Sequence, residues 1–256
     1  MINRLAVILI GQYRTWPICS KYLLNFFKDK ANRVDYFFVT WDKTSVYVNG
    51  AWSDPVIKVT YDQLSEFFDK DQNVWYKIIS DIPNIHTYYR MAYLSQAANE
   101  LKKEVEHQNN FVYDQVVETR PDIYLRSYPK GGLECKWPSC QDFEYSGGEI
   151  TNIGHRDLFM PDCYLRTNSF THNILSQRIN EFDVSQSFQK HIFNKDYRNG
   201  HHAMLAKFLL DNNIQRIYSN YPDYEFDTVI RNNEMSNVNL DELTLDEIVS
   251  LNRRYH

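Results

Sequence analysis

Two apolar runs near the start of the chain predict buried strands of a parallel sheet. Residues 5–10 are continuously apolar and lead into Gly11, and residues 34–39 form a second, largely apolar run. Such runs, without alternating polar positions, are typical of strands covered on both faces. Between them, apolar residues at helical spacing over 18–27 follow Thr15, which we expect to cap a helix. Strand, helix and strand in this order predict a right-handed βαβ unit.

A long helix and a third strand are predicted further along the chain. Apolar positions spaced three and four residues apart indicate a helix over about residues 88–106 with one buried face. These positions are Met91, Leu94, Ala98, Leu101 and Val105. Residues 111–117 then predict the third major strand. Residues 126–148 are rich in Pro, Gly, Ser and Lys and are expected to form a long loop.

The order of these elements predicts an α/β fold. Capping boxes at Thr60 with Gln63 and at Thr244 with Glu247 predict two further helix starts. The 256 residues show no internal repeat and no interdomain linker. We therefore expect a single domain.

Composition narrows the classes of partner. The formal net charge is -5, so the surface offers no general attraction to nucleic acid, and an anionic ligand would need a local basic pocket. The apolar run at residues 5–10 is too short to span a membrane, so we expect no transmembrane segment and a cytoplasmic protein. Of the four cysteines only Cys135 and Cys140 are close, and their spacing does not match a zinc site, which favours free thiols.

Polar clusters follow three of the predicted strands, at residues 11–15, 40–42 and 118–122. Ligands of open α/β sheets collect beyond the carboxyl ends of the strands, so we expect the three clusters to face one crevice. Gly11 permits a tight turn, and Arg14 precedes a helix N-terminus, where anions are favoured. Neither a dinucleotide fingerprint nor a P-loop is present. An ordinary turn with a surface arginine is the alternative for the first cluster.

The third cluster carries alternating charges. Glu118, Arg120 and Asp122 would share one side of an extended chain. Two carboxylates that flank a guanidinium can hold a divalent cation or clamp a diphosphate. A surface ion pair at a strand end is the alternative.

Four segments in this order resemble a group of viral and bacterial glycosyltransferases that have the GT-A fold and often build surface glycans. They lie at residues 8–16, 35–42, 89–90 and 113–123. The resemblance implies a Rossmann-like, mixed and mostly parallel sheet flanked by helices, in one GT-A-like domain over residues 1–256. It further implies a nucleotide-binding part over residues 1–125 and an acceptor-side part with the C-terminal helices over residues 126–256.

The resemblance also implies a reaction. A sugar would move from a nucleoside-diphosphate sugar donor to a hydroxyl of a glycan or glycoconjugate acceptor, as in polysaccharide biosynthesis. The enzyme would work in the cytoplasm, or in the host cytoplasm if it is viral, without nucleic acid as a partner. A non-catalytic nucleotide- or glycan-binding domain that retains the fold is the alternative.

Roles for donor binding follow from position in the resemblance. The residues that would line the donor pocket are Gly11, Gln12, Arg14, Thr15, Asp42, Tyr89, Arg90 and Arg120. Asp122, with Glu118, stands where GT-A enzymes place the element that binds a metal, here Mn2+ or Mg2+. The sequence lacks a strict Asp-x-Asp there, and Arg120 supplying positive charge in the metal's place is the alternative.

Catalytic candidates lie further along the chain. The resemblance makes Asp157 the first candidate for a general base that takes the proton of the acceptor hydroxyl. His202, or its neighbour His201, is a candidate base or metal ligand. A loop-capping aspartate and surface histidines are the alternatives.

Overall fold

The computed structural model places the parts of the chain that carry most of the predicted core. The described residues are 2–45, 47–48, 51–52, 57–80, 87–127, 143–145, 164–180, 208–209, 211–212, 214, 216–218, 224–229, 237–244, 247–248 and 250–251. The catalytic candidates Asp157, His201 and His202 lie outside them, as do Cys135 and Cys140.

Among the described residues, seven strands form one main sheet, in the order β12-β10-β11-β8-β1-β2-β7. They are β1 (Ile2–Gly11), β2 (Ala31–Trp41), β7 (Asn73–Ile79), β8 (Gln115–Thr119), β10 (Phe143–Tyr145), β11 (Tyr164–Thr167) and β12 (Arg216–Tyr218). β7, β2, β1 and β8 run parallel to one another, whereas β11 is antiparallel to both β8 and β10. The sheet is therefore mixed and mostly parallel, and the α/β class is confirmed.

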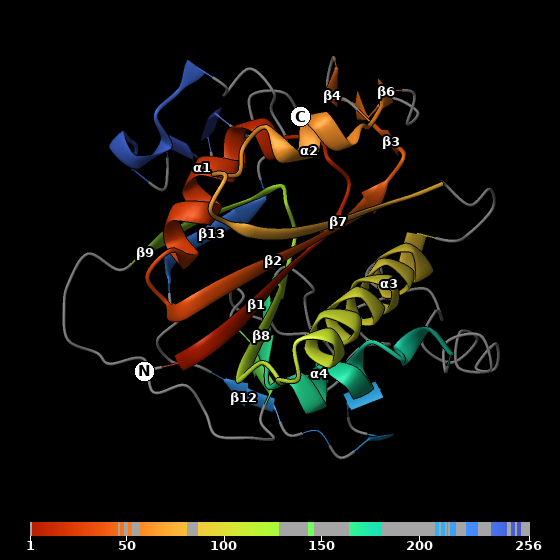
Figure 1. Cartoon of the computed structure of the whole chain (residues 1–256). Coiled ribbons are helices and arrows are strands. Elements are labelled where there is room, and N and C mark those ends of the chain that lie inside the picture. The colour runs from red at the N-terminus through yellow and green to blue at the C-terminus, as the bar shows by residue number, and fades with distance from the viewer. Residues whose placement is uncertain are drawn as a thin grey trace.

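Helices cover both faces of this sheet. α1 (Trp16–Phe27) lies on one face and α3 (Thr87–Gln108) on the other (Figure 1). Successive side chains of β1 point to opposite faces. Leu5, Val7 and Leu9 join the cluster packed by α1, whereas Ala6, Ile8 and Ile10 join the cluster packed by α3. Because both faces are covered, β1 carries no polar alternation, and this is why its apolar run predicts a buried strand.

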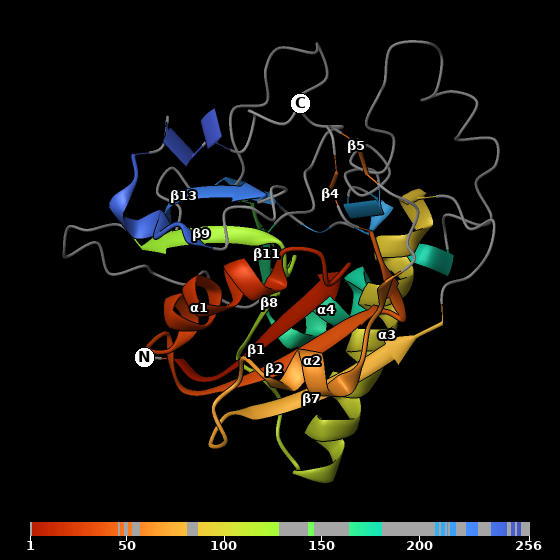
Figure 2. The same cartoon turned by 90° about the horizontal axis from the view of Figure 1, so that it is seen from above.

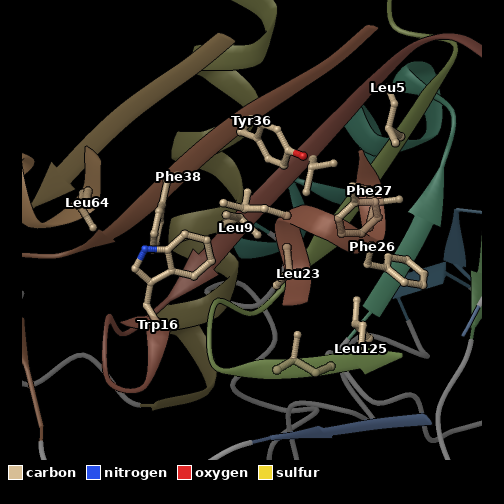
Figure 3. Close-up of a cluster of buried hydrophobic side chains, with 14 of the residues drawn as sticks. Leu5, Leu9, Trp16, Leu23, Phe26, Phe27, Tyr36, Phe38, Leu64 and Leu125 are labelled. Carbon is tan, nitrogen blue, oxygen red and sulfur yellow. The ribbon is translucent and has the colours of Figure 1, made fainter. Parts of the chain in front are cut away.

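An aromatic group fixes the start of α1 (Figure 3). The ring of Trp16 meets Phe38 of β2 edge-on, with centroids 5.0 Å apart, and stacks on Phe68 at 5.6 Å. Aromatic pairs of this kind add about 1 kcal/mol each beyond their buried area. The turn between β1 and α1 is thus held by packing at its helical end.

A second layer covers the outer side of α1 (Figure 2). β9 (Ile123–Ser127) pairs antiparallel with β13 (Tyr224–Val229), and Tyr124 of β9 meets Tyr22 of α1 edge-on at 4.9 Å. The 3-10 helix η3 (Leu240–Glu242) joins this layer, because the backbone N–H of Leu240 donates to the Tyr22 hydroxyl at 2.8 Å. α1 is therefore enclosed between two layers.

Shorter elements complete the described structure. They are β3 (Lys43–Thr44) paired with β6 (Ile57–Lys58), β4 (Tyr47–Val48) paired with β5 (Ala51–Trp52), α2 (Tyr61–Ser65) and α4 (Ser169–Leu175). α2 begins with the expected capping box at Thr60, and the reciprocal bonds between Thr244 and Glu247 form the other one. Within the described parts of the chain, no helix has the length and apolar character needed to cross a bilayer.

Candidate functional site

The first and third polar clusters lie side by side at one edge of the sheet. β1 and β8 are adjacent and parallel, while β2 and β7 lie on the other side of β1. The chain order therefore reverses between β1 and β8, and their carboxyl ends form a topological switch point, where ligands of open α/β sheets bind. The expected proximity of the first and third clusters is confirmed, while the crevice that all three were expected to face stays a prediction.

The two clusters touch at Gly11. Its φ angle of 142° is one that residues with a side chain rarely adopt. A Cβ atom built on Gly11 would also lie 3.2 Å from Cδ of Pro121, in the turn that follows β8. Glycine is thus required for two reasons, backbone conformation and close approach.

Arg14 is held in an uncommon backbone conformation. Its φ angle is 26°, in a region that costs about 1–3 kcal/mol for a non-glycine residue and is enriched at functional sites. The backbone N–H of Arg14 donates to Oγ1 of Thr44 at 2.9 Å, and its Nε donates to Oε1 of Gln12 at 2.8 Å. Gln12 Oε1 also accepts from the backbone N–H of Ser45 at 3.4 Å. The segment after β2 thereby joins the site.

A buried carboxylate holds two guanidinium groups together. Arg120 donates from Nε and Nη2 to the two oxygens of Asp122, at 2.8 and 2.9 Å, and Nη1 of Arg14 lies 3.5 Å from Oδ2. The Asp122 side chain is 3% exposed, and each arginine side chain is 21% exposed. The expected alternative of an ion pair at the strand end is present, but its carboxylate is buried under the arginines and does not lie on the surface.

The protonation state of Asp122 follows from this pairing. Burial alone would raise the pKa of its carboxyl group, but Arg120 and then Arg14 outweigh burial and lower the pKa below its usual value. Asp122 therefore stays ionised at neutral pH. The guanidinium groups of Arg14 and Arg120 bring positive charge to these strand ends in a chain whose net charge is -5. Together they form the local cluster of basic side chains that an anionic ligand would need.

The backbone amides at the start of α1 add little to that basic cluster. The N–H of Trp16 donates to the Tyr13 carbonyl at 2.7 Å, and the N–H of Ile18 donates to the Thr15 carbonyl at 2.9 Å. Pro17 between them has no N–H group. The Thr15 side chain makes no cap and instead contacts the thiol of Cys19. The expected contribution of this helix N-terminus is thus corrected, and the positive charge comes from side chains.

The second cluster borders the same edge. Asp42 follows β2, where its N–H donates to the Ile79 carbonyl and its carbonyl accepts from Val59, both at 2.8 Å. The guanidinium of Arg90 lies 5.6 Å from the ring centroid of Trp41, so the start of α3 lies against the end of β2. Tyr89 packs against a separate apolar cluster that includes Leu165 of β11.

Glu118 does not belong to this site, which corrects its expected pairing with Asp122. The chain turns at Pro121 and Asp122, so the side chains do not share one side of an extended strand. Glu118 points to the α3 face, where Arg178 Nη2 donates to its Oε1 at 2.8 Å and His172 Nε2 lies 3.1 Å from Oε2. Burial raises the pKa of Glu118, but Arg178 and His172 outweigh it and lower that pKa to about 2.

This second group is a buried polar cluster between α3, β8 and α4 that sequence reasoning missed. Ser95 donates to Glu118 and accepts from Arg178 Nη1 at 2.8 Å, and His172 Nδ1 lies 3.0 Å from Oδ1 of Asn99. Burial lowers the pKa of His172 against the pull of Glu118. The side chains are 0–5% exposed. A cluster this enclosed joins α3, β8 and α4 in the interior of the protein.

Lys102 extends the buried cluster along α3. Its side chain is fully buried, and its Nζ donates to Oε2 of Glu106 at 3.0 Å and to the Ser169 hydroxyl. Glu106 Oε1 in turn accepts from the backbone N–H of Tyr113 at 3.0 Å. The cation is thus matched by a carboxylate one helical turn away.

The two carboxylates predicted to hold Mn2+ or Mg2+, Asp122 and Glu118, do not fit such a site together. Both oxygens of Asp122 accept hydrogen bonds from a guanidinium, and both oxygens of Glu118 are engaged on the other face of the sheet. In the described ranges, no group of three or more His, Cys, Asp or Glu side chains could hold a metal ion.

Four of the sequence-predicted residues meet around one point, and two others border it. Gly11, Gln12, Arg14 and Arg120 surround Asp122 and Pro121, while Asp42 and Arg90 flank the end of β2. Tyr89 packs in the separate cluster with Leu165. Thr44 and Ser45 also join the site and were not predicted. Their only signal in the sequence is that they lie in a short polar segment after β2. The sequence matches no protein-family model and no curated protein.

Proposed function

We propose that this chain is a glycosyltransferase that moves a sugar from a nucleoside-diphosphate sugar to a hydroxyl of a glycan or other acceptor. The observation that supports this most is the pair of guanidinium groups gathered at the switch point of the sheet. Guanidinium groups bind phosphate oxygens through paired, charge-assisted hydrogen bonds. A diphosphate at this edge would lie against Arg14 and Arg120.

The chemistry asks for positive charge at that point. In glycosyl transfer the bond between the anomeric carbon and the diphosphate oxygen breaks, and a bond from that carbon to the acceptor oxygen forms. The acceptor hydroxyl gives its proton to a base, for which Asp157 and His202 remain the candidates. The diphosphate leaves with the bonding electrons, so fixed positive charge beside it stabilises the transition state.

The architecture supports a GT-A assignment. In the parallel part of the sheet, β7-β2-β1 has the strand order of a mononucleotide-binding half-domain, and β8 follows on the other side of β1. The sheet then continues through the reversed strand β11, so it departs from the all-parallel dinucleotide-binding order. A mixed, mostly parallel sheet is what the resemblance to GT-A transferases implies. The cytoplasm remains the proposed location.

A binding domain without catalysis is the second candidate. It is favoured by one observation, the burial of Asp122 beneath two arginines, which would serve binding equally well. The two candidates differ in turnover. A transferase releases nucleoside diphosphate from a donor, slowly to water and faster with an acceptor, whereas a binding domain releases none.

The test is a panel of nucleotide sugars with release of nucleoside diphosphate as the readout. We expect release from at least one donor, and its loss in Arg14→Ala and Arg120→Ala. Arg4→Ala is the matched control, because Arg4 lies at the opposite end of β1 and packs on the Phe111 ring at 4.5 Å. Nucleotide binding without release in any reaction would favour the binding domain. Neither binding nor release would refute both candidates.

A further inference from the structure

We infer that Asp122 is a positioning residue that aims the guanidinium groups of Arg14 and Arg120 at a diphosphate, where metal-dependent transferases hold a divalent cation. The inference rests on the proposed function and deepens it, because it names what neutralises the diphosphate. It follows that this site binds nucleoside diphosphates without Mn2+ or Mg2+.

The carboxylate of Asp122 is already occupied by a guanidinium group. A metal ligand must offer an oxygen lone pair toward the ion. Asp122 instead accepts from Nε and Nη2 of Arg120, one oxygen each, and is 3% exposed. A cation could reach it only by displacing a bidentate guanidinium, so the carboxylate serves the arginines and not an ion.

The neighbouring acid Glu118 does not supply a second metal ligand beside Asp122. Glu118 is the other carboxylate of the segment, and it lies on the opposite face of the sheet with Arg178 and His172. The turn at Pro121 separates the two acids. The paired acids that a metal site would use are thus divided between two clusters, each already neutralised by cations of the chain.

The two guanidinium groups are held in place by contacts within the chain. Arg120 is fixed by its two-point contact with Asp122. Arg14 is fixed by Gln12 on its side chain and by Thr44 on its backbone, in a conformation with φ of 26°. Charges held in place before the ligand arrives cost little reorganisation on binding.

The two arginine side chains are accessible to a ligand from solvent. Each of the two arginine side chains keeps 21% of its surface exposed while the carboxylate between them is covered. The exposed part of the cluster is therefore guanidinium surface, which binds phosphate oxygens. The order of layers is therefore carboxylate inside, guanidinium groups outside, and ligand beyond them.

Calorimetric titration with UDP, GDP and dTDP, each in EDTA and in Mn2+, tests the inference. We expect one of them to bind with affinities that agree within about twofold in the two buffers. Binding that weakens by more than about tenfold in EDTA would overturn the inference and leave the proposed function standing. Failure of all three to bind in either buffer would overturn both.

Variants of Arg120 separate geometry from charge. We expect Arg120→Lys to weaken diphosphate binding by about tenfold, because lysine keeps the charge and loses the fork that two-point contacts require. Binding of the matching nucleoside should change by less than about twofold, and Arg4→Lys should change neither. Equal losses for nucleoside and diphosphate would indicate a general disturbance of the fold and would overturn the inference.

A variant of Asp122 tests its positioning role. Asp122→Asn keeps the shape of the side chain and removes the charge that gathers the two arginines. We expect weaker diphosphate binding in EDTA, with nucleoside binding preserved. Full wild-type affinity for the diphosphate in this variant would overturn the role of Asp122. So would diphosphate binding that is weak in EDTA for both proteins and that Mn2+ restores in the wild-type protein but not in Asp122→Asn.

Discussion

Arg178 neutralises a carboxylate in the interior, so its removal has a calculable effect on stability. Arg178 Nη2 donates to Glu118 Oε1 at 2.8 Å, and the two side chains are 4% and 2% exposed. Breaking a buried ion pair by removing one partner costs about 3–5 kcal/mol, because the remaining charge is left without compensation. We expect Arg178→Met to lose that much free energy of unfolding at about pH 7.5.

The pH dependence identifies the cause. In the wild-type protein the pKa of Glu118 is lowered to about 2, so its stabilising contribution is complete above its unfolded pKa and is lost as the pH falls toward 2. In Arg178→Met, burial without the arginine raises that pKa. Proton uptake by Glu118 then relieves the unpaired charge, so the destabilisation should shrink between about pH 7.5 and pH 5.

Urea denaturation at both pH values measures this difference. The double variant Glu118→Gln with Arg178→Met is the control, since it removes both charges and should be more stable than Arg178→Met alone at about pH 7.5. A loss below about 1 kcal/mol in Arg178→Met, typical of surface pairs, would refute the reasoning. So would a loss that stays constant or grows as the pH falls.

Three further changes probe the site and the buried cluster. Gly11→Ala should destabilise the fold by about 2–4 kcal/mol in urea denaturation, because it adds backbone strain and a contact with Pro121; a stability unchanged within error would show that the turn adapts. Asp122→Ala should cost about 1–3 kcal/mol by the same measurement, more than an exposed acid would, since it leaves two arginines without their carboxylate. Lys102→Met should lower the thermal midpoint through the loss of about 2–4 kcal/mol, as Glu106 stays buried without its cation; a raised midpoint would mean that packing outweighs the pair.

The sequence predicts those parts of the fold whose pattern reflects burial on both faces. The run at residues 5–10 became the interior of β1 for that reason, and the capping boxes at Thr60 and Thr244 were confirmed because they depend on local hydrogen bonds. β7 was missed, since its side chains are half buried at the edge of the sheet. Its pattern is therefore weaker than that of the central strands.

The site was only partly predictable, for a physical reason that Glu118 and Asp122 illustrate. Alternation in the sequence placed both acids on one side, but a turn at Pro121 sends them to opposite faces. Sequence spacing contains no information about such a turn once the strand ends. The partners of Glu118 were equally hidden, because Arg178 and His172 come from the region of α4, far along the chain.

The short passage between β8 and β9 has a mechanical consequence. Only three residues, 120–122, carry the chain from the main sheet to the layer on the outer side of α1. β9 is tied through Tyr124 to Asp241 near the end of the chain, by a hydrogen bond of 2.9 Å. A shift of the outer layer over α1 would therefore displace Arg120. β13 and η3, which belong to that layer, thereby restrain the position of the basic edge.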